Sequence, residues 1–539
     1  MASTAHFVRP PDMARLVPGY DRRFMKRRAR HLLGSVAAPL WLAAAAAAQQ
    51  DLRAFLPDDS LAVVAVGDPR GAVRALHAAV GDVPKGLPPE VAALVGTGLV
   101  VMRTLLGGDV DGFVERLAAG GAALAVVADG ERARSLLVLR PGDLPAARAW
   151  FAARGEGVYA ETAGDLLLVA ANREGCARLR AGVEKPGSRW VGAATGAAVL
   201  SGTVDLAAVR TRLGDRAVRV AALDGGGRFL LAPVAHALET GTALRFAVHG
   251  GEVLTLQADV DAAVVGSKWE GLLAANGEPR AMLPLRPDGV ALLTLDRSLR
   301  ALLANAERFL GESDQLGVKS FLSIAEALDG ASTSFLDDLL GGLREPFTVH
   351  VLPVAPGADG EPESPLQLPG LVLTAPIADA AVEPILSRMA QVLATIANGE
   401  RAQRGRRPFV LRALRSELGK GFVAEAPEWR GPGLPPIEAA LSPTLLCGHG
   451  HMVLATTTVA AEQVLGAAAA GKTQQVAADL AIVRGPQLAA VLTRSRAALE
   501  LGRMLDEGEG PAEALREATL RLTVHGGATH LELRLERRR

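Results

Sequence analysis

The chain has 539 residues, of which 49% are hydrophobic and 22% charged, so it is long enough for several domains and apolar enough to bury large cores. Its 58 basic and 58 acidic residues balance and only 4% of the residues are aromatic, which argues against a nucleic-acid partner. Two cysteines exclude a disulfide-dense scaffold and a multi-cysteine zinc or iron–sulfur framework.

Residues 1–48 have the features of a secretory signal. A basic stretch from Lys26 to Arg30 precedes an apolar run from Leu32 to Leu42, and the alanines that follow offer a cleavage site near Ala48. Glycine, serine and proline interrupt the apolar run, so it makes a poor membrane span, although a retained anchor is the alternative. The sequence leaves open whether Met1 or Met25 is the start.

Cleavage near Ala48 predicts a mildly acidic chain that is periplasmic or secreted. Residues 1–48 hold eight basic and two acidic residues, which leaves 50 basic and 56 acidic residues, a net charge of −6. No later apolar run is long enough to span a bilayer. An oxidising compartment would permit a disulfide between Cys176 and Cys447, which the sequence leaves open, as it does the oligomeric state.

Four pairs of segments recur in the same order along the chain. The segments that begin at Leu56, Gly164, Ala197 and Leu244 resemble those that begin at Leu283, Gly450, Asp479 and Leu520. We therefore predict a tandem duplication. The first copy covers 49–262, a linker covers 263–282, and the second copy covers 283–539 with loop insertions near 353–370 and 398–409.

Alternating apolar residues predict strands, and these come in adjacent pairs with helices between them. The clearest pair in each copy surrounds a His-Gly-Gly turn, at His249 in the first copy and at His525 in the second. Helices are expected from Asp143, a plausible N-cap, and from Ile377. The predicted class is α+β: two tandem copies of an antiparallel-sheet domain with helices packed on one face.

The opening of the first copy carries a family resemblance. The segment Leu-Pro-Asp-Asp-Ser-Leu-Ala-Val-Val-Ala-Val from Leu56, directly after an export signal, resembles secreted bacterial proteins of unknown function that begin L-P-A-D-T-L and have duplicated α+β halves. The second copy departs from this pattern at Leu285 and Arg286. The resemblance implies export and the duplicated fold, and it implies no activity for any residue.

Two motifs suggest chemistry, and each has a simpler structural interpretation. Gly466–Thr473 matches a phosphate-binding loop, but a predicted helix precedes the glycines where that loop requires a strand, so Lys472 is better explained as a cation at a helix C-terminus. Cys447, His449 and His451 could bind zinc or copper from one strand edge. The alternative is a hairpin turn around Gly448-His449-Gly450.

Other candidates are weaker. His249 and His525 occupy equivalent positions, which favours a shared turn over two catalytic sites. His530 has no counterpart in the first copy. Three acidic pairs lie at predicted helix starts or in loops, where solvent and helix dipoles explain them: Asp58 with Asp59, Asp337 with Asp338, and Glu361 with Glu363.

The sequence favours a non-enzymatic binding or structural protein of the bacterial cell envelope, with an unidentified protein or envelope ligand as its partner and no cofactor. The alternatives are a periplasmic hydrolase with an unrecognised site and a metal-handling protein that uses Cys447, His449 and His451. An exposed apolar patch would favour the binding protein. A deep polar pocket with perturbed carboxylates would favour the hydrolase.

Overall fold

The computed structural model describes residues 51–66, 120–153 except 131, 158–191, 198–214, 232–263 except 251–252, 279–353 with gaps at 299, 302–314, 317–318, 320–322 and 324–334, 369–425 except 380–381 and 406, 442–491, and 515–537 except 526–527. The predicted export signal at 1–48 lies outside these residues. Within them, no helix is long and apolar enough to cross a membrane.

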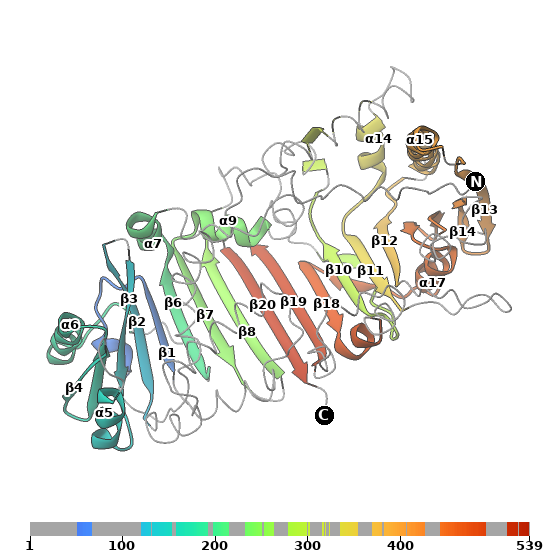
Figure 1. Cartoon of the computed structure of the whole chain (residues 1–539). Helices are drawn as coiled ribbons and strands as arrows, with labels where there is room; N and C mark the ends of the chain where they lie inside the picture. The colour runs from blue at the N-terminus through green and yellow to red at the C-terminus, as the bar shows by residue number, and fades with distance from the viewer. Residues whose placement is uncertain are drawn as a thin grey trace, which may run out of the picture.

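Eighteen described strands form one antiparallel sheet that runs the length of the molecule (Figure 1). The first half of the chain contributes eight of them: β1 (Ala62–Val66), β2 (Ala122–Asp129), β3 (Arg132–Leu139), β4 (Tyr159–Ala163), β5 (Leu166–Ala170), β6 (Leu200–Asp205), β7 (Ala243–His249) and β8 (Val253–Asp261). From the outer edge inward their order is β4-β5-β3-β2-β1-β6-β7-β8.

The second half contributes ten strands: β10 (Ala291–Leu295), β11 (Phe347–Leu352), β12 (Gly370–Pro376), β13 (Val410–Ser416), β14 (Gly419–Glu425), β15 (Thr444–Gly448), β16 (His451–Ala455), β18 (Asp479–Arg484), β19 (Leu515–His525) and β20 (Ala528–Arg537). From the centre outward their order is β20-β19-β18-β10-β11-β12-β16-β15-β14-β13. A separate two-stranded sheet pairs β9 (Arg280–Met282) with β17 (Gln474–Val476).

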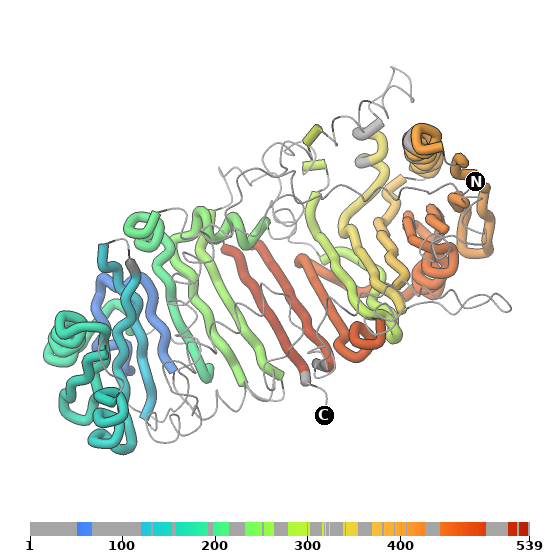
Figure 2. The backbone as a smooth tube through the Cα atoms, in the orientation of Figure 1, coloured from blue at the N-terminus to red at the C-terminus, as the bar shows by residue number. Residues whose placement is uncertain are grey.

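The two halves join at the centre through β8 and β20. These strands pair antiparallel in a continuous register from Asp261 opposite Ala528 to Val253 opposite Glu536. In Figure 2 the green strands of the first half lie directly beside the red C-terminal strands. Both are outer strands of predicted hairpins, β7–β8 and β19–β20, and both hairpins are present. We call the β8–β20 pairing the seam.

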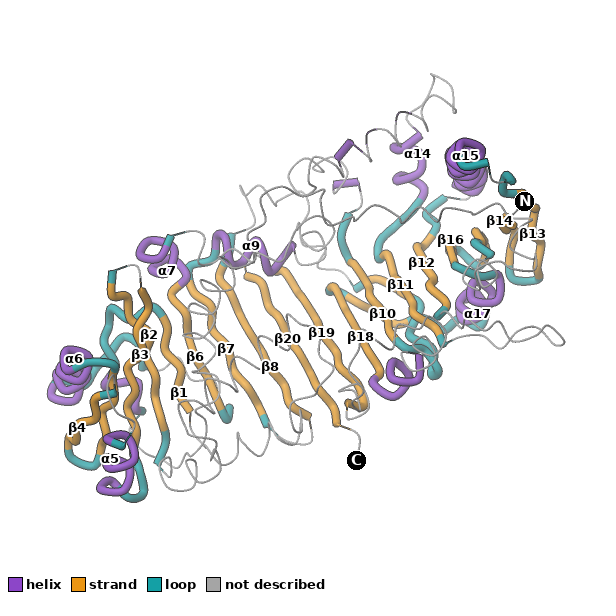
Figure 3. Tube along the Cα trace, viewed as in Figure 1, coloured by secondary structure: helices purple, strands orange, loops and turns teal. Residues whose placement is uncertain are grey.

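Helices cover both faces of the sheet at each end (Figure 3). In the first half they are η3 (Leu52–Phe55), α5 (Leu144–Ala152), α6 (Arg173–Glu184), α7 (Leu206–Leu213) and α9 (Ala232–Thr240); in the second half they are α14 (Phe335–Gly342), α15 (Val382–Gln403) and α17 (Thr458–Ala469). As predicted, the Asp143 carboxylate accepts from Ala146 N at the start of α5, at 2.9 Å.

The expectation of helices on a single face is wrong. Leu137, Leu139 and Leu167 pack against α5, whereas their neighbours Leu136 and Leu168 pack against η3 and α6. Successive residues of a strand point to opposite faces, so α5 and α6 lie on opposite sides of the sheet. In the second half α14 and α15 share one core cluster and α17 another, again with alternating strand residues.

Two predicted boundaries also change. The expected linker at 263–282 contains β9 at its end, which belongs with β17 of the second half. The expected loop at 398–409 is in fact the last turns of α15 followed by a short turn into β13. Most of the other expected insertion, 354–368, lies outside the described residues.

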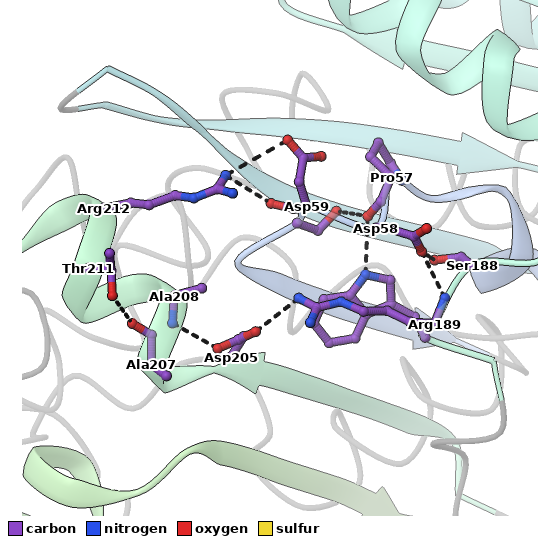
Figure 4. A network of polar contacts seen from close by, with 12 residues as sticks. Pro57, Asp58, Asp59, Ser188, Arg189, Asp205, Ala207, Ala208, Thr211 and Arg212 are labelled. Atoms are coloured by element: carbon purple, nitrogen blue, oxygen red, sulfur yellow. Dashed lines mark hydrogen bonds and ion pairs between the residues drawn. The ribbon is translucent and has the colours of Figure 1, made fainter.

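Hydrogen bonds hold the turn before β1 in place (Figure 4). One carboxylate oxygen of Asp58 accepts from Ser188 Oγ at 3.0 Å and from Arg189 N at 2.8 Å. The indole of Trp190 donates to the Pro57 carbonyl at 3.1 Å. These contacts join the start of β1 to residues 188–190, which are distant in sequence, and they give the acidic residues of this turn a structural role.

Candidate functional site

The central strands carry an apolar strip on one face of the sheet. Register places Val248 beside Leu256, Leu256 beside Leu533, and Leu533 beside Leu520. All members of the strip are half-buried. In the first half the residues in line with it are buried, namely Leu200, Ala122, Leu139 and Leu167, whereas in the second half Leu293, Val349, Leu373 and Leu454 are half-buried like the strip. We call this set the seam strip: Phe246, Val248, Leu254, Leu256, Leu520, Leu531, Leu533 and Leu535.

The position of the described helices accounts for the exposure of the seam strip. Following the strand pairing outward, the strip lies on the face that α5 covers at one end and α15 at the other. At one margin of the central strands, α7 and α9 pack against Val260, which is 5% exposed. Beyond that margin the leucines keep part of their surface exposed. A partner that removes this apolar surface from water lowers the free energy of the system.

The opposite face of the central strands is polar and cross-linked. Across the seam, His530 Nδ1 and an Asp259 carboxylate oxygen lie 2.6 Å apart, and Gln257 donates to Glu532 at 3.4 Å. Arg245 forms an ion pair with Asp261 at 3.1 Å. Several charges on this face are paired with one another, so the two faces of the seam differ in chemistry.

A charged cluster lies at the end of β10, where β9, β18 and the segment before β11 meet. Arg297 and Asp479 form an almost fully buried ion pair, with Arg297 Nε 2.6 Å from Asp479 Oδ2. The other Asp479 oxygen accepts from Asp296 N at 2.8 Å. Arg280 bridges Asp296 at 3.3 Å and Glu345 at 3.0 Å. The cluster joins four separate parts of the second half.

Burial has the largest effect on the pKa values of the two aspartates in this cluster. It raises the pKa of Asp296 to about 6, with Asp479 and Glu345 adding to the rise and Arg280 opposing it. Burial also raises the pKa of Asp479 against the opposing effect of Arg297. The Asp296 side chain is only 6% exposed, so a substrate in solution has little access to it.

His350 on β11 is a second unusual group. It is fully buried, neither ring nitrogen has a hydrogen-bond partner, and burial lowers its pKa to about 4. Its cross-strand neighbours are Leu292 and Val372. In the next layer of the same face, Thr294, Thr348 and Thr374 lie opposite one another across three strands. This face of the second half therefore holds polar groups inside an apolar core.

The structure separates the residues of the hypothetical metal site. Cys447 packs into the apolar cluster under α15, while His451 lies opposite Gly448 on the other face of the β15–β16 hairpin. His449 occupies the turn with a positive φ of 48°, and its carbonyl oxygen lies 3.0 Å from His451 Nδ1. No metal-binding group of three or more such side chains occurs among the described residues. The hairpin interpretation is correct.

The two cysteines are both free and buried. Cys176 belongs to α6 at one end of the sheet and Cys447 to β15 near the other, so they do not pair within the chain (Figure 1). Burial raises the pKa of both thiols, that of Cys447 to about 12. Neither is a reactive thiolate at neutral pH.

The remaining sequence candidates have structural roles or lie outside the described residues. Gly466–Thr473 is the C-terminal turn of α17, where Gly471 N and Lys472 N donate to helix carbonyls. His249 and His525 end β7 and β19 at their hairpins. Asp338 lies on α14, and Glu361 and Glu363 are not among the described residues.

Sequence reasoning missed the seam strip, His350 and the cluster around Arg297 and Asp479. The strip had a signal in the alternating leucines of the two terminal hairpins, but only the pairing of β8 with β20 makes them one surface. No local signal distinguishes His350 from an exposed strand residue.

Comparison with known proteins adds no relative from which a function could be transferred. No protein-family model, no curated protein and no solved structure matches this chain. The resemblance of the Leu56 opening to secreted bacterial proteins therefore stays a sequence-based expectation, and the function rests on the chemistry of the described residues.

Proposed function

We propose that this chain is an exported, non-enzymatic binding protein of the bacterial cell envelope, which holds an apolar ligand against the seam strip. The observation that carries the proposal is the contrast along one face of a continuous sheet. Apolar residues in line with the seam strip are buried beneath α5 in the first half, whereas those of the strip itself are half-buried. An apolar ligand such as an acyl chain matches a surface formed by leucine, valine and phenylalanine.

We also propose that the two halves are tandem copies. The order β4-β5-β3-β2-β1-β6-β7-β8 corresponds strand for strand to β15-β16-β12-β11-β10-β18-β19-β20. Ser60 N donates to the carbonyl three residues earlier just before β1, and Gly289 N does the same before β10. These parallels support the duplication, with β13 and β14 as an additional hairpin in the second copy.

The duplication explains why an apolar surface occurs at the seam. The terminal hairpin of each copy packs one apolar face and ends in an edge strand. Joining the two edges as β8 and β20 removes both free edges and brings the two apolar faces together. A surface twice as wide as either hairpin results, and neither copy alone would have it.

A hydrolase is the second candidate, because one observation favours it. The pKa of Asp296, raised to about 6 beside Arg280, is the kind of perturbation found in catalytic acids. Its 6% exposure counts against substrate access. Hydrolysis of an ester or glycoside panel that is lost in Asp296→Asn but retained in Thr348→Val would support this candidate over the binding protein.

The binding proposal is tested with the double variant Leu256→Gln, Leu533→Gln. N-phenyl-1-naphthylamine, which fluoresces in apolar surroundings, should bind the wild-type chain, and the variant should lose about tenfold in affinity because two central apolar side chains are gone. The measurement is a fluorescence titration with thermal unfolding followed in parallel.

The matched control is Thr255→Ala with Gln257→Ala, which changes the same strand on the polar face. It should bind the probe as the wild type does. Equal loss in both double variants at equal stability, or probe binding that neither affects, would contradict the role of the seam strip.

A further inference from the structure

The second half carries one hairpin that has no counterpart in the first. Between α5 and β4 the chain runs only from Ala153 to Val158, whereas between α15 and β15 it contains β13 and β14. These two strands extend the sheet beyond β15, so β13 becomes its outer edge. Leu414 and Leu418 of this hairpin pack against the core cluster under α17, and its outer strand adds a new edge to the sheet.

This hairpin and the turn before it are strongly basic. Residues 398–420 contain seven basic residues and two acidic ones, in a chain whose predicted mature form has a net charge of −6. The side chains that the structure describes as exposed are Arg404, Arg407, Arg412, Arg415 and Lys420. The excess positive charge is therefore local, at one end of an otherwise acidic molecule.

Two of these cations are placed against each other. Arg415 on β13 lies directly opposite Lys420 on β14, so both side chains project from the same face. Like charges directly opposite in an antiparallel pair destabilise the sheet. Among the described residues neither forms an ion pair. At the other edge of the sheet the comparable charge is neutralised, because Arg180 pairs with Glu161 of β4 at 2.8 Å.

The same strand exposes apolar surface. Val410, the first residue of β13, is 52% exposed, one of the few large apolar side chains in the described structure with so much surface in water. Register places Val410 opposite Glu425, on the other face of β13 from Arg415, so the cations do not share a face with this apolar side chain. The clustered cations are what an anionic bilayer attracts, because each basic residue near its surface adds to the binding.

The geometry points to the β13–β14 hairpin, with Arg404 and Arg407 in the turn before it, as a docking surface for an anionic phospholipid membrane. Unpaired cations at Arg415 and Lys420 approach the headgroup phosphates. This surface lies at the end of the sheet, away from the seam strip, so it stands independently of the proposed apolar ligand (Figure 1).

The test is flotation of the purified mature chain, residues 49–539, with lipid vesicles. Binding is expected to phosphatidylcholine vesicles that contain about 30% phosphatidylglycerol, not to pure phosphatidylcholine, and is expected to disappear in about 0.5 M salt. A chain of net charge −6 should be repelled by such vesicles unless a local basic surface acts.

The decisive variant is Lys420→Glu. This substitution places a carboxylate directly opposite Arg415, so thermal stability should stay equal or rise. The affinity for anionic vesicles should fall. Combining it with Arg407→Glu should lower affinity about tenfold or more. Loss of binding together with a gain in stability cannot come from misfolding.

The control with the same change in net charge is Arg173→Glu with Lys185→Glu, at exposed positions in and just after α6 at the other end of the molecule. It should keep vesicle binding, as should the seam variant Leu256→Gln, Leu533→Gln. Equal loss in the α6 control, binding only to soluble polyphosphate, or no preference for anionic vesicles would overturn the proposal.

Discussion

Replacing Asp479 with asparagine is expected to destabilise the second half of the molecule by about 4 kcal/mol, because it breaks a buried ion pair by removing one of the two charges. Arg297 is 5% and Asp479 7% exposed, so solvent cannot replace the lost carboxylate. Asparagine retains an oxygen that can accept from Asp296 N, so the effect isolates the charge. Hydrogen exchange of β10 and β18 measures it, with β1 and β6 as the internal reference.

Two further variants define the origin of the effect. Adding Arg297→Met to Asp479→Asn should recover most of the stability, because an apolar side chain then replaces the second charge of the buried pair. Glu425→Gln, which breaks the exposed Arg412–Glu425 pair of 2.7 Å in the same half, should cost at most about 1 kcal/mol. A loss in Asp479→Asn no larger than that of Glu425→Gln would show that the buried pair contributes little.

The second large effect is a pair of opposite pH dependences. His350 has a pKa of about 4 when folded and about 6.5 when unfolded, so its contribution to stability is present above pH 6.5 and is lost as the pH falls to 4. Asp296 has a pKa of about 6 when folded and about 3.8 when unfolded, so its contribution is present below pH 3.8 and is lost as the pH rises to 6. Each amounts to about 3 kcal/mol, and in the wild type they nearly cancel.

Single variants should reveal each dependence. Relative to the wild type, His350→Leu should gain stability as the pH falls from 6.5 to 4, because the folded state no longer holds an imidazole that resists protonation. Asp296→Asn should gain stability relative to the wild type as the pH rises from 4 to 6. Urea unfolding at a series of pH values measures both slopes.

Thr348→Val is the control for these slopes. It alters a buried polar side chain on the same face as His350 without removing a titratable group, so its effect should not vary with pH. Parallel pH profiles for His350→Leu and the wild type would show that the ring does not stay neutral in the folded protein.

Local periodicity made the hairpins and many of the strands predictable. The alternation before His249 and His525 depends only on neighbouring residues, and the structure confirms both hairpins. The turn around Gly448–Gly450 and the N-cap at Asp143 also depend only on neighbouring residues, so the sequence predicted both. The pairing of β8 with β20 was not predictable, because it joins residues more than 260 positions apart and no local pattern encodes it.

The helices on both faces did have a signal in the sequence. Leu166, Leu167 and Leu168 are consecutive and all buried, and a strand without alternation is typical of a sheet covered on both sides. The alternating strands at the seam, by contrast, have one polar face. The β13–β14 hairpin was not predicted, because the basic loop expected at 398–409 ends where β13 begins at Val410. The buried pair of Arg297 and Asp479 depends on contacts between distant segments.

Native mass spectrometry of the chain exported from a bacterial host tests whether the seam strip binds an apolar ligand. We expect a product that begins at Gln49 and carries a noncovalently bound apolar species, which is absent from Leu256→Gln, Leu533→Gln but present in Thr255→Ala, Gln257→Ala. A product that retains residues 25–48, or a fully folded wild-type chain that carries no apolar species and acquires none from added fatty acid, would contradict an exported protein that binds through the seam strip.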